Sequence, residues 1–155
     1  MLIGRRDVST LGARLRRRGK TIVFTNGVFD LLHRGHVAYL TKARSLGDVL
    51  VVGLNSDRSA RRLKGPGRPL QSQADRAAVL LALRAVDYVV VFGEDRPDRL
   101  IEELKPDVLV KGADYRLADI AGADFVHSHG GKVKRIRLTP GRSSSELLRK
   151  LKPRR

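Results

Sequence analysis

The feature that most constrains the fold is an alternation of short apolar runs with helical patterns. Residues 49–54 are the clearest run, a continuous apolar stretch of the kind that is buried on both faces of a parallel sheet. Four further runs with the character of strands are residues 21–25, 88–92, 108–110 and 133–138. Strands that alternate with helices favour a parallel sheet covered on both faces, with right-handed crossovers. We therefore predict an α/β fold, a three-layer sandwich around a five-stranded parallel Rossmann-like sheet.

The segments between these runs divide into helices and one long loop. Helical spacing of apolar residues predicts the helices 35–46, 72–85, 97–104, 120–127 and 144–151. Residues 58–70, RSARRLKGPGRPL, are rich in Arg, Lys, Gly and Pro and predict a loop. Residues 1–20 are interpreted as a basic, weakly amphipathic lead-in, 21–151 as the folded domain and 152–155 as a basic tail.

The formal net charge of +16 points at first to a nucleic-acid binder, so its distribution matters. Residues 1–20 carry +6 and residues 132–155 carry +9, which leaves +1 for all of 21–131. The body of the domain is therefore nearly neutral. No aromatic ladder for stacking bases accompanies the basic ends, because the chain has only seven Phe and Tyr residues and no Trp. A basic nucleic-acid-binding module is kept as the alternative from another class.

Composition sets further bounds. The chain is 41% hydrophobic and 31% charged, as expected of a globular domain, and has no run of about 18 apolar residues that would predict a membrane span. The N-terminus shows no secretory signal, so we expect a cytoplasmic protein and no membrane partner. The absence of cysteine excludes disulfides, thiolate chemistry and cysteine zinc sites.

Polar segments follow four of the predicted strands. In parallel sheets ligands bind outside the carboxyl ends of the strands, which is where residues 26–36, 55–68, 111–115 and 141–145 fall. Their Lys, Arg, His, Asp, Ser and Gly residues indicate a phosphorylated ligand. Neither GxGxxG nor GxxxxGK[ST] is present, so dinucleotide redox chemistry and P-loop phosphoryl transfer have little support.

The first of these segments has the parts of a phosphate site. A strand, the turn Thr25-Asn26-Gly27 and a helix start place His33 and His36 around Gly35. The first turn of a helix leaves backbone N–H groups unpaired and carries about half a positive charge, which favours an anion. Both imidazoles would add donors to that anion. Metal binding by the two histidines is the weaker interpretation, because no third ligand stands near them at suitable spacing.

The stretch NGVFDLLHRGH, residues 26–36, resembles the first motif of the cytidylyltransferase-like nucleotidyltransferases, whose HxGH element it reproduces. Within that superfamily, residues 21–148 resemble the adenylyltransferases that activate D-glycero-manno-heptose 1-phosphate, which occur as half of a bifunctional kinase–adenylyltransferase or as separate proteins. The resemblance implies a fold of the nucleotidylyltransferase type and transfer of AMP from ATP to the sugar phosphate, with ADP-heptose and pyrophosphate as products. It also implies Mg²⁺ with the ATP, a homodimer, and a sugar kinase on another chain. A related enzyme that uses CTP or ATP with glycerol phosphate, ethanolamine phosphate or another phosphorylated acceptor is the alternative.

The resemblance also implies roles for individual residues. The catalytic residues it implies are His33, His36 and Lys64. The nucleotide-binding residues are Asn26, Gly27, Phe29, His36, Lys111, Gly112, Asp114, Ser143, Ser144 and Ser145, and the substrate-binding residues are Asp30, Asn55, Asp57, Lys64, Arg68 and Arg76. The chain departs from the cytidylyltransferase pattern at Leu138, where relatives carry an arginine. Arg142 is a candidate to replace that charge.

The implied reaction limits what the protein must supply. A phosphate monoester has its second pKa near 6, so the nucleophile is already ionised and needs no general base. The protein must instead hold two anions together and stabilise the charge that develops on pyrophosphate. We expect His33 and His36 to act as hydrogen-bond donors to the triphosphate. Magnesium would be bound mostly by substrate oxygens and water, so no protein ligand is assigned to it.

Overall fold

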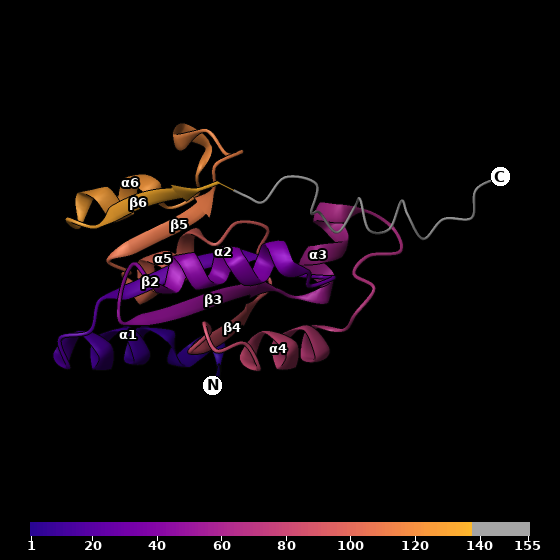
Figure 1. Cartoon of the computed structure of the whole chain (residues 1–155), viewed down its shortest axis with the longest axis horizontal. Coiled ribbons are helices and arrows are strands. Elements are labelled where there is room, and N and C mark those ends of the chain that lie inside the picture. Colours follow the sequence, from indigo (N-terminus) through magenta and orange to yellow (C-terminus); the bar gives the residue numbers. More distant parts are fainter. Residues whose placement is uncertain (138–155) are drawn as a thin grey trace.

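A computed structural model describes residues 1–137 of the chain, and Figure 1 shows their arrangement around one parallel sheet. The strand order is β1-β4-β3-β2-β5-β6, and every pair of neighbours is parallel. The strands are β1 (Leu2–Ile3), β2 (Ile22–Gly27), β3 (Val49–Asn55), β4 (Tyr88–Phe92), β5 (Val108–Gly112) and β6 (Lys132–Ile136). The predicted parallel α/β architecture is thus confirmed.

The predicted number of strands is wrong, because the sheet has six rather than five. The additional strand, β1, pairs with the outer edge of β4, where Leu2 lies opposite Val89 and Ile3 opposite Val90. The N-terminal ammonium of Met1 also donates to the carbonyl of Asp87 at 2.6 Å. Two residues are too few to show a periodic pattern. Their strand character depends on the open edge of β4, which the local sequence does not reveal.

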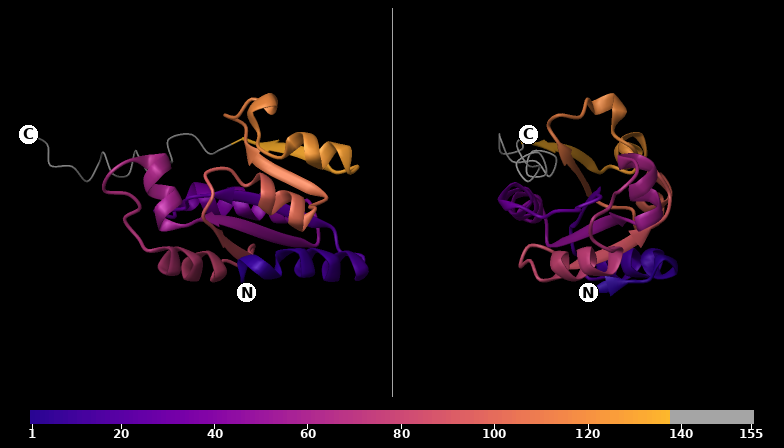
Figure 2. Two further views of the ribbon diagram at one scale, coloured as in Figure 1. Left: turned by 180° about the vertical axis from the view of Figure 1, so that it is seen from behind. Right: turned by 90° about the vertical axis from the view of Figure 1, so that its right-hand side faces the viewer.

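Helices cover both faces of the sheet, which makes the three layers visible in Figure 2. The helices are α1 (Val8–Arg17), α2 (Arg34–Arg44), α3 (Asp57–Lys64), α4 (Gln73–Leu81), α5 (Asp98–Leu104) and α6 (Ala123–Ser128), with short 3₁₀ turns η1 (Arg5–Asp7) and η2 (Leu117–Asp119). Buried residues of α1, α5 and α6 share one apolar core with the sheet, and those of α2 and α4 share a second core on the opposite face. Within residues 1–137, no helix has the length and apolarity to cross a membrane.

The N-terminal segment is part of the packed structure, although we interpreted residues 1–20 as a lead-in. Helix α1 buries Val8, Leu11 and Leu15 against the sheet. It also approaches the C-terminal end of α5 closely, because a Cβ at Gly12 would lie 2.4 Å from the carbonyl oxygen of Leu104. A side chain at position 12 would therefore push the two helices apart.

The loop predicted for residues 58–70 is partly wrong, because its first half is helix α3. The hydroxyl of Ser56 caps this helix by accepting the backbone N–H of Ser59 at 3.2 Å. The helix ends at Gly65, whose φ of +90° a residue with a side chain rarely adopts. Arginine and lysine are good helix formers. However, α3 buries only Ser59 and Ala60, so it lacks the apolar stripe by which an amphipathic helix is recognised in a sequence.

Because all strands are parallel, their carboxyl ends meet at one edge of the sheet. The connections that follow β2, β3, β4 and β5 gather at this edge, together with the start of α2 (Figure 1). The predicted serine motif at 143–145, the predicted helix 144–151, Leu138 and Arg142 lie outside the described residues.

Candidate active site

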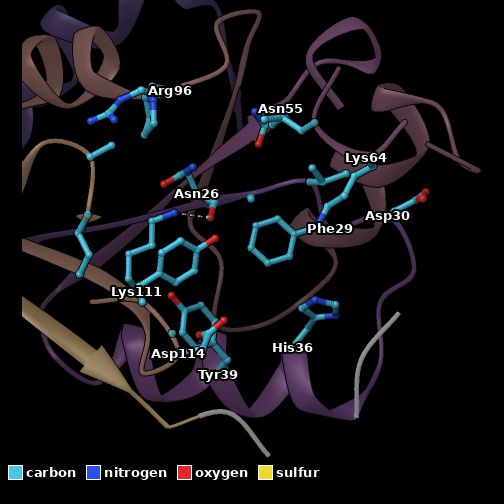
Figure 3. Close-up of a pocket in the computed structure, with 18 of the residues that line it drawn as sticks. Asn26, Phe29, Asp30, His36, Tyr39, Asn55, Lys64, Arg96, Lys111 and Asp114 are labelled. Atoms are coloured by element: carbon cyan, nitrogen blue, oxygen red, sulfur yellow. Dashed lines mark hydrogen bonds between the residues drawn. The ribbon is translucent and has the colours of Figure 1, made fainter. Parts of the chain in front are cut away.

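A pocket of about 570 Å³ opens at the carboxyl edge of the sheet. Its walls come from β2 and the residues after it, α2, α3, and the connections that follow β4 and β5 (Figure 3). Most of the predicted site residues line it, namely Asn26, Gly27, Phe29, Asp30, His33, His36, Asn55, Lys64, Arg68, Lys111, Gly112 and Asp114. The structure therefore brings together residues that are as far as 88 positions apart in the sequence.

The two histidines of the HxGH element form the start of α2. His33 is the N-cap residue, and its Nδ1 accepts the backbone N–H of Gly35 at 3.1 Å. The Nδ1 of His36 accepts the backbone N–H of His33 at 3.4 Å, and the two ring centroids lie 3.9 Å apart. An imidazole nitrogen that accepts carries no proton, so each neutral ring has its proton on Nε2. The capping arrangement thus fixes which nitrogen of His36 acts as the donor.

His36 is neutral at ordinary pH. Burial, and after it the charge of His33, lower the pKa of His36 from 6.5 to about 4. A neutral imidazole donates one hydrogen bond, and an anion placed beside it would favour the protonated form and raise its pKa. His36 is therefore an uncharged donor in the free protein that can gain a proton when a phosphate group binds.

The ring of Phe29 braces His36 from the side. Phe29 has a φ of +46°, in the left-handed region that is uncommon for a residue with a side chain. Its ring meets that of His36 edge-on, with 5.4 Å between centroids, and lies 3.0 Å from where a Cβ at Gly27 would be. The glycine therefore leaves room for the aromatic ring, and the ring limits the positions that His36 can take.

Lys111 contributes a buried amine from the end of β5. Its Nζ lies 3.4 Å from the backbone oxygen of Asn26, a contact drawn in Figure 3, and 5.2 Å from the centroid of the Tyr115 ring. Burial lowers the pKa of Lys111 from 10.5 to about 8, although the carboxylate of Asp114 opposes the shift. The buried Oδ1 of Asn26 has no hydrogen-bond partner among residues 1–137. A ligand that fills this part of the pocket would meet the Lys111 ammonium.

Lys64 and Arg68 line the wall opposite Lys111, and their side chains differ in their bonding partners. Lys64 is exposed at the end of α3, and its ammonium makes no hydrogen bond or ion pair with residues 1–137. The Nε of Arg68 donates to Asp30 at 2.6 Å. The Asp30 carboxylate also accepts the backbone N–H groups of Leu70 and Gln71 at 2.8 and 3.1 Å. Asp30 and Arg68 therefore hold the segment between α3 and α4 in place, whereas the ammonium of Lys64 is available to a ligand.

Arg76 and Asp57, both predicted to bind substrate, do not line the pocket. Arg76 is only 1% exposed and donates to the carbonyls of Val28 and Asn55 at 2.6 and 2.9 Å. It also donates to the carbonyl of Gln71 at 3.0 Å and to the carboxylate of Asp57 at 2.7 Å. Its guanidinium thus ties together the ends of β2, β3 and the start of α4 behind the pocket wall. This placement is that of a structural support.

Several lining residues were not predicted. The connection between β4 and α5 contributes Asp95, Arg96 and Pro97, and α2 contributes Tyr39. The rule that ligands bind at the carboxyl ends of strands applies to β4 as well and would have found the first three. Tyr39 is one helical turn from His36, and its hydroxyl shares a 2.8 Å hydrogen bond with Thr25. The remaining unpredicted lining residues are Val28, Gly35, Leu63, Tyr115, Asp119, Ile120 and Ala121.

Within residues 1–137, no three His, Asp or Glu side chains are grouped so that they could hold a metal ion. The pocket is lined by imidazole, ammonium, guanidinium and amide groups as well as the carboxylates of Asp30, Asp95, Asp114 and Asp119, and the N-terminus of α2 lies beside them. Its cations, its neutral donors and the helix N-terminus suit an anion.

Comparisons with known proteins agree with this geometry. The family described as cytidylyltransferase-like matches residues 24–145. The bifunctional protein HldE of Syntrophotalea carbinolica is 60% identical over 136 residues, which are 88% of this chain and 28% of that protein. The HldE of Wolinella succinogenes is 52% identical over 97% of this chain and 31% of its own length. The chain therefore spans less than a third of the length of these curated relatives.

Solved structures share the fold. A lipopolysaccharide core biosynthesis protein from Thermoplasma volcanium has a TM-score of 0.63 and 31% identity, covering 78% of this chain and 98% of that one. A pantothenate synthetase from Thermus thermophilus has a TM-score of 0.61 at 20% identity, covering 88% of this chain and 61% of its own. The second likeness concerns the fold alone.

Proposed function

Because this chain belongs to the cytidylyltransferase-like family, we propose that it transfers AMP from ATP to D-glycero-manno-heptose 1-phosphate, with ADP-heptose and pyrophosphate as products. The enzyme is a nucleotidyltransferase. One observation carries the choice of reaction. The N-terminus of α2 and the Nε2 donor of His36 face the same pocket as Lys64 and Lys111. This arrangement suits a polyphosphate.

In the proposed mechanism an oxygen of the sugar phosphate attacks the α-phosphorus of ATP, and the bond from that phosphorus to the bridging oxygen of pyrophosphate breaks. The nucleophile is an anion near neutral pH, so no side chain has to remove a proton. His33 and His36 donate hydrogen bonds to the triphosphate, where charge grows in the transition state. Lys64 neutralises phosphate charge from the α3 wall and Lys111 does so from the β5 wall.

The metal belongs to the same proposal. Bound to ATP, Mg²⁺ would screen the phosphate charges and stabilise the departing pyrophosphate. Its ligands would be chiefly triphosphate oxygens and water, because the described residues form no carboxylate cluster. The side chains of this chain then act on the substrate oxygens that the metal leaves exposed.

The identity of acceptor and base is supported by likeness. The sequence resemblance to heptose 1-phosphate adenylyltransferases and the similarity to proteins named HldE both favour ATP and a heptose phosphate. A lipopolysaccharide core biosynthesis protein among the structural neighbours favours a product used in surface glycans. The sugar kinase expected upstream, the dimer and the cytoplasmic location belong to the proposal as well. The relatives named bifunctional are more than three times as long as this chain. Their additional length has room for a kinase domain in the same polypeptide.

The proposed function is tested by incubating the protein with ATP or CTP, Mg²⁺ and each of three acceptors, namely heptose 1-phosphate, glycerol 3-phosphate and ethanolamine phosphate. Release of pyrophosphate and the mass of the sugar nucleotide are followed. We expect pyrophosphate and ADP-heptose from ATP with heptose 1-phosphate, and little product with the other combinations. A CDP product, or turnover only with another acceptor, would reassign the enzyme within its family.

A further inference from the structure

One wall of the pocket is the β4–α5 loop, residues 93–97, which connects β4 to α5. Three of its residues, Asp95, Arg96 and Pro97, line the pocket. Arg96 is itself paired with Asp98 at the start of α5, with 3.0 Å between Nε and the carboxylate. The position of this wall depends on what holds the loop from outside.

Helix α3 holds the loop by three hydrogen bonds. The Arg62 guanidinium donates to the carbonyl of Gly93 at 2.7 Å and to the carboxylate of Asp95 at 2.7 Å. One helical turn earlier, the hydroxyl of Ser59 donates to the carbonyl of Glu94 at 2.9 Å. Three successive residues of the loop are thus fixed to one face of α3.

The same helix supplies the neighbouring part of the wall. Leu63 and Lys64 follow Arg62 directly, and both line the pocket. Arg62 itself does not line it. The two contacts of Arg62 with the β4–α5 loop therefore fix the position of the loop relative to Lys64.

The loop is also held on its other side. Arg5 in η1 pairs with Glu94 at 3.4 Å and with Glu103 of α5. This contact anchors Glu94, whereas the Arg62 contacts anchor Gly93 and Asp95. Among the described residues, Arg62 is thus the side chain of α3 that contacts two residues of the loop.

The two ends of the pocket differ in chemistry. Beside β5 the lining includes the Tyr115 ring, Ile120 and Ala121, an apolar surface suited to a flat base. Beside β3 and β4 the lining is Asn55, Asp95 and Arg96, which provide an amide, a carboxylate and a cation. A phosphorylated acceptor with many hydroxyl groups needs donors and acceptors of this mixed kind.

We propose that Arg62 is a positioning residue for the acceptor, because it clamps the β4–α5 loop against α3 and so sets the shape of the polar end of the pocket. The inference rests on the proposed function for the kind of acceptor. Arg62 makes no contact with the apolar end of the pocket beside β5, where the base of the nucleotide would bind. Loss of the clamp therefore weakens acceptor binding much more than ATP binding.

The test compares Arg62→Ala and Arg62→Lys with Arg61→Ala. Arg61 is the preceding residue on α3, exposed, and makes no side-chain hydrogen bond or ion pair with the described part of the chain. KM values for heptose 1-phosphate and for ATP are measured separately, and unfolding temperatures are recorded. We expect Arg62→Ala to raise the acceptor KM about tenfold while the ATP KM changes less than about twofold. Arg62→Lys keeps a charge but only one of the two contacts, so its effect should be smaller, and Arg61→Ala should behave as the parent protein.

Equal increases in both KM values, or no change in an active Arg62→Ala variant, would overturn the inference and leave the proposed function standing. A fall in kcat with both KM values unchanged would also overturn it. If the parent protein produced no sugar nucleotide from any acceptor, the proposed function would fail. The assignment of the polar end of the pocket to the acceptor would then fail as well.

Discussion

The backbone N–H of His33 donates to the Nδ1 of His36, so the N-cap residue of α2 fixes the tautomer of the second histidine of the HxGH element. The donor nitrogen of His36 is therefore Nε2 before any ligand arrives. Because a preorganised donor costs no reorganisation during the reaction, this relationship links the start of a helix to the chemistry of the site.

His36→Ala should lower kcat by about 10²- to 10³-fold, the usual loss for one transition-state donor, with little change in fold. His127→Ala is the matched control, because His127 is an exposed histidine at the end of α6 and is not a lining residue of the pocket. Steady-state kinetics and circular dichroism of both variants provide the measurement. Unchanged turnover in His36→Ala would remove the histidine pair from the mechanism.

Binding of ATP should be coupled to proton uptake by His36. Its pKa of about 4 in the free protein leaves the ring neutral at pH 6, and the triphosphate charge should raise that pKa on binding. Affinity for ATP should therefore increase as pH falls from about 7 to about 5. Calorimetry in buffers of different ionisation enthalpy measures the protons taken up, and His36→Gln should lose the coupling. An unchanged proton count in that variant would assign the uptake elsewhere.

The same pKa shift has a consequence for stability. The unfolded chain has the higher pKa of 6.5, so it binds protons more readily than the folded protein between about pH 6.5 and pH 4. The free energy of unfolding should be at its full value above pH 6.5 and should fall as pH falls through this range. In His36→Gln the fall should be shallower. Urea titrations at pH 7 and pH 5 make the comparison, and equal slopes for the two proteins would contradict it.

Lys111→Met should weaken ATP binding without destabilising the fold. The ammonium of Lys111 is buried at a cost, as its lowered pKa of about 8 shows, so an apolar side chain of similar length should raise or preserve the unfolding temperature at pH 7. The ATP KM should rise about tenfold, as expected when one charged phosphate contact is lost. Lys132→Met, at an exposed position on β6, is the control. A strongly destabilised Lys111→Met would show that the amine supports the sheet instead.

Arg76→Met should destabilise the protein by about 3 kcal/mol or more, because it leaves several buried carbonyls without donors. Arg84→Met changes an exposed arginine after α4 and should have little effect. Chemical denaturation of the two variants gives the difference. If Arg76→Met were as stable as its control and instead lost acceptor binding, Arg76 would be a ligand contact, as the sequence resemblance implied.

The parts of the fold that could be predicted are those in which local pattern and burial agree. Strand β3 was readable because all seven of its residues are buried, which produces a continuous apolar run. Strand β1 was missed because Leu2 and Ile3 become a strand only beside β4. Helix α3 was missed because it is held through polar contacts of Ser59 and Arg62 rather than an apolar face.

The candidate site shows the same division. His33 and His36 were predicted because their spacing and the helix start are local features. The role of Arg76 depends on carbonyl groups at Val28 and Asn55, which the fold alone brings within reach. An arginine near a phosphate site and an arginine behind its wall look the same in a sequence. The structure separates them by exposure and by the partners of the guanidinium.

In the proposed reaction His36 donates to the triphosphate of ATP while an ionised acceptor displaces pyrophosphate. A crystal structure of the protein with Mg²⁺ and a non-hydrolysable ATP analogue shows whether this contact forms. We expect phosphate oxygens at hydrogen-bond distance from the Nε2 of His36, with Lys64 and Lys111 on either side. A triphosphate bound elsewhere, or an imidazole turned away from it, would exclude this role of His36.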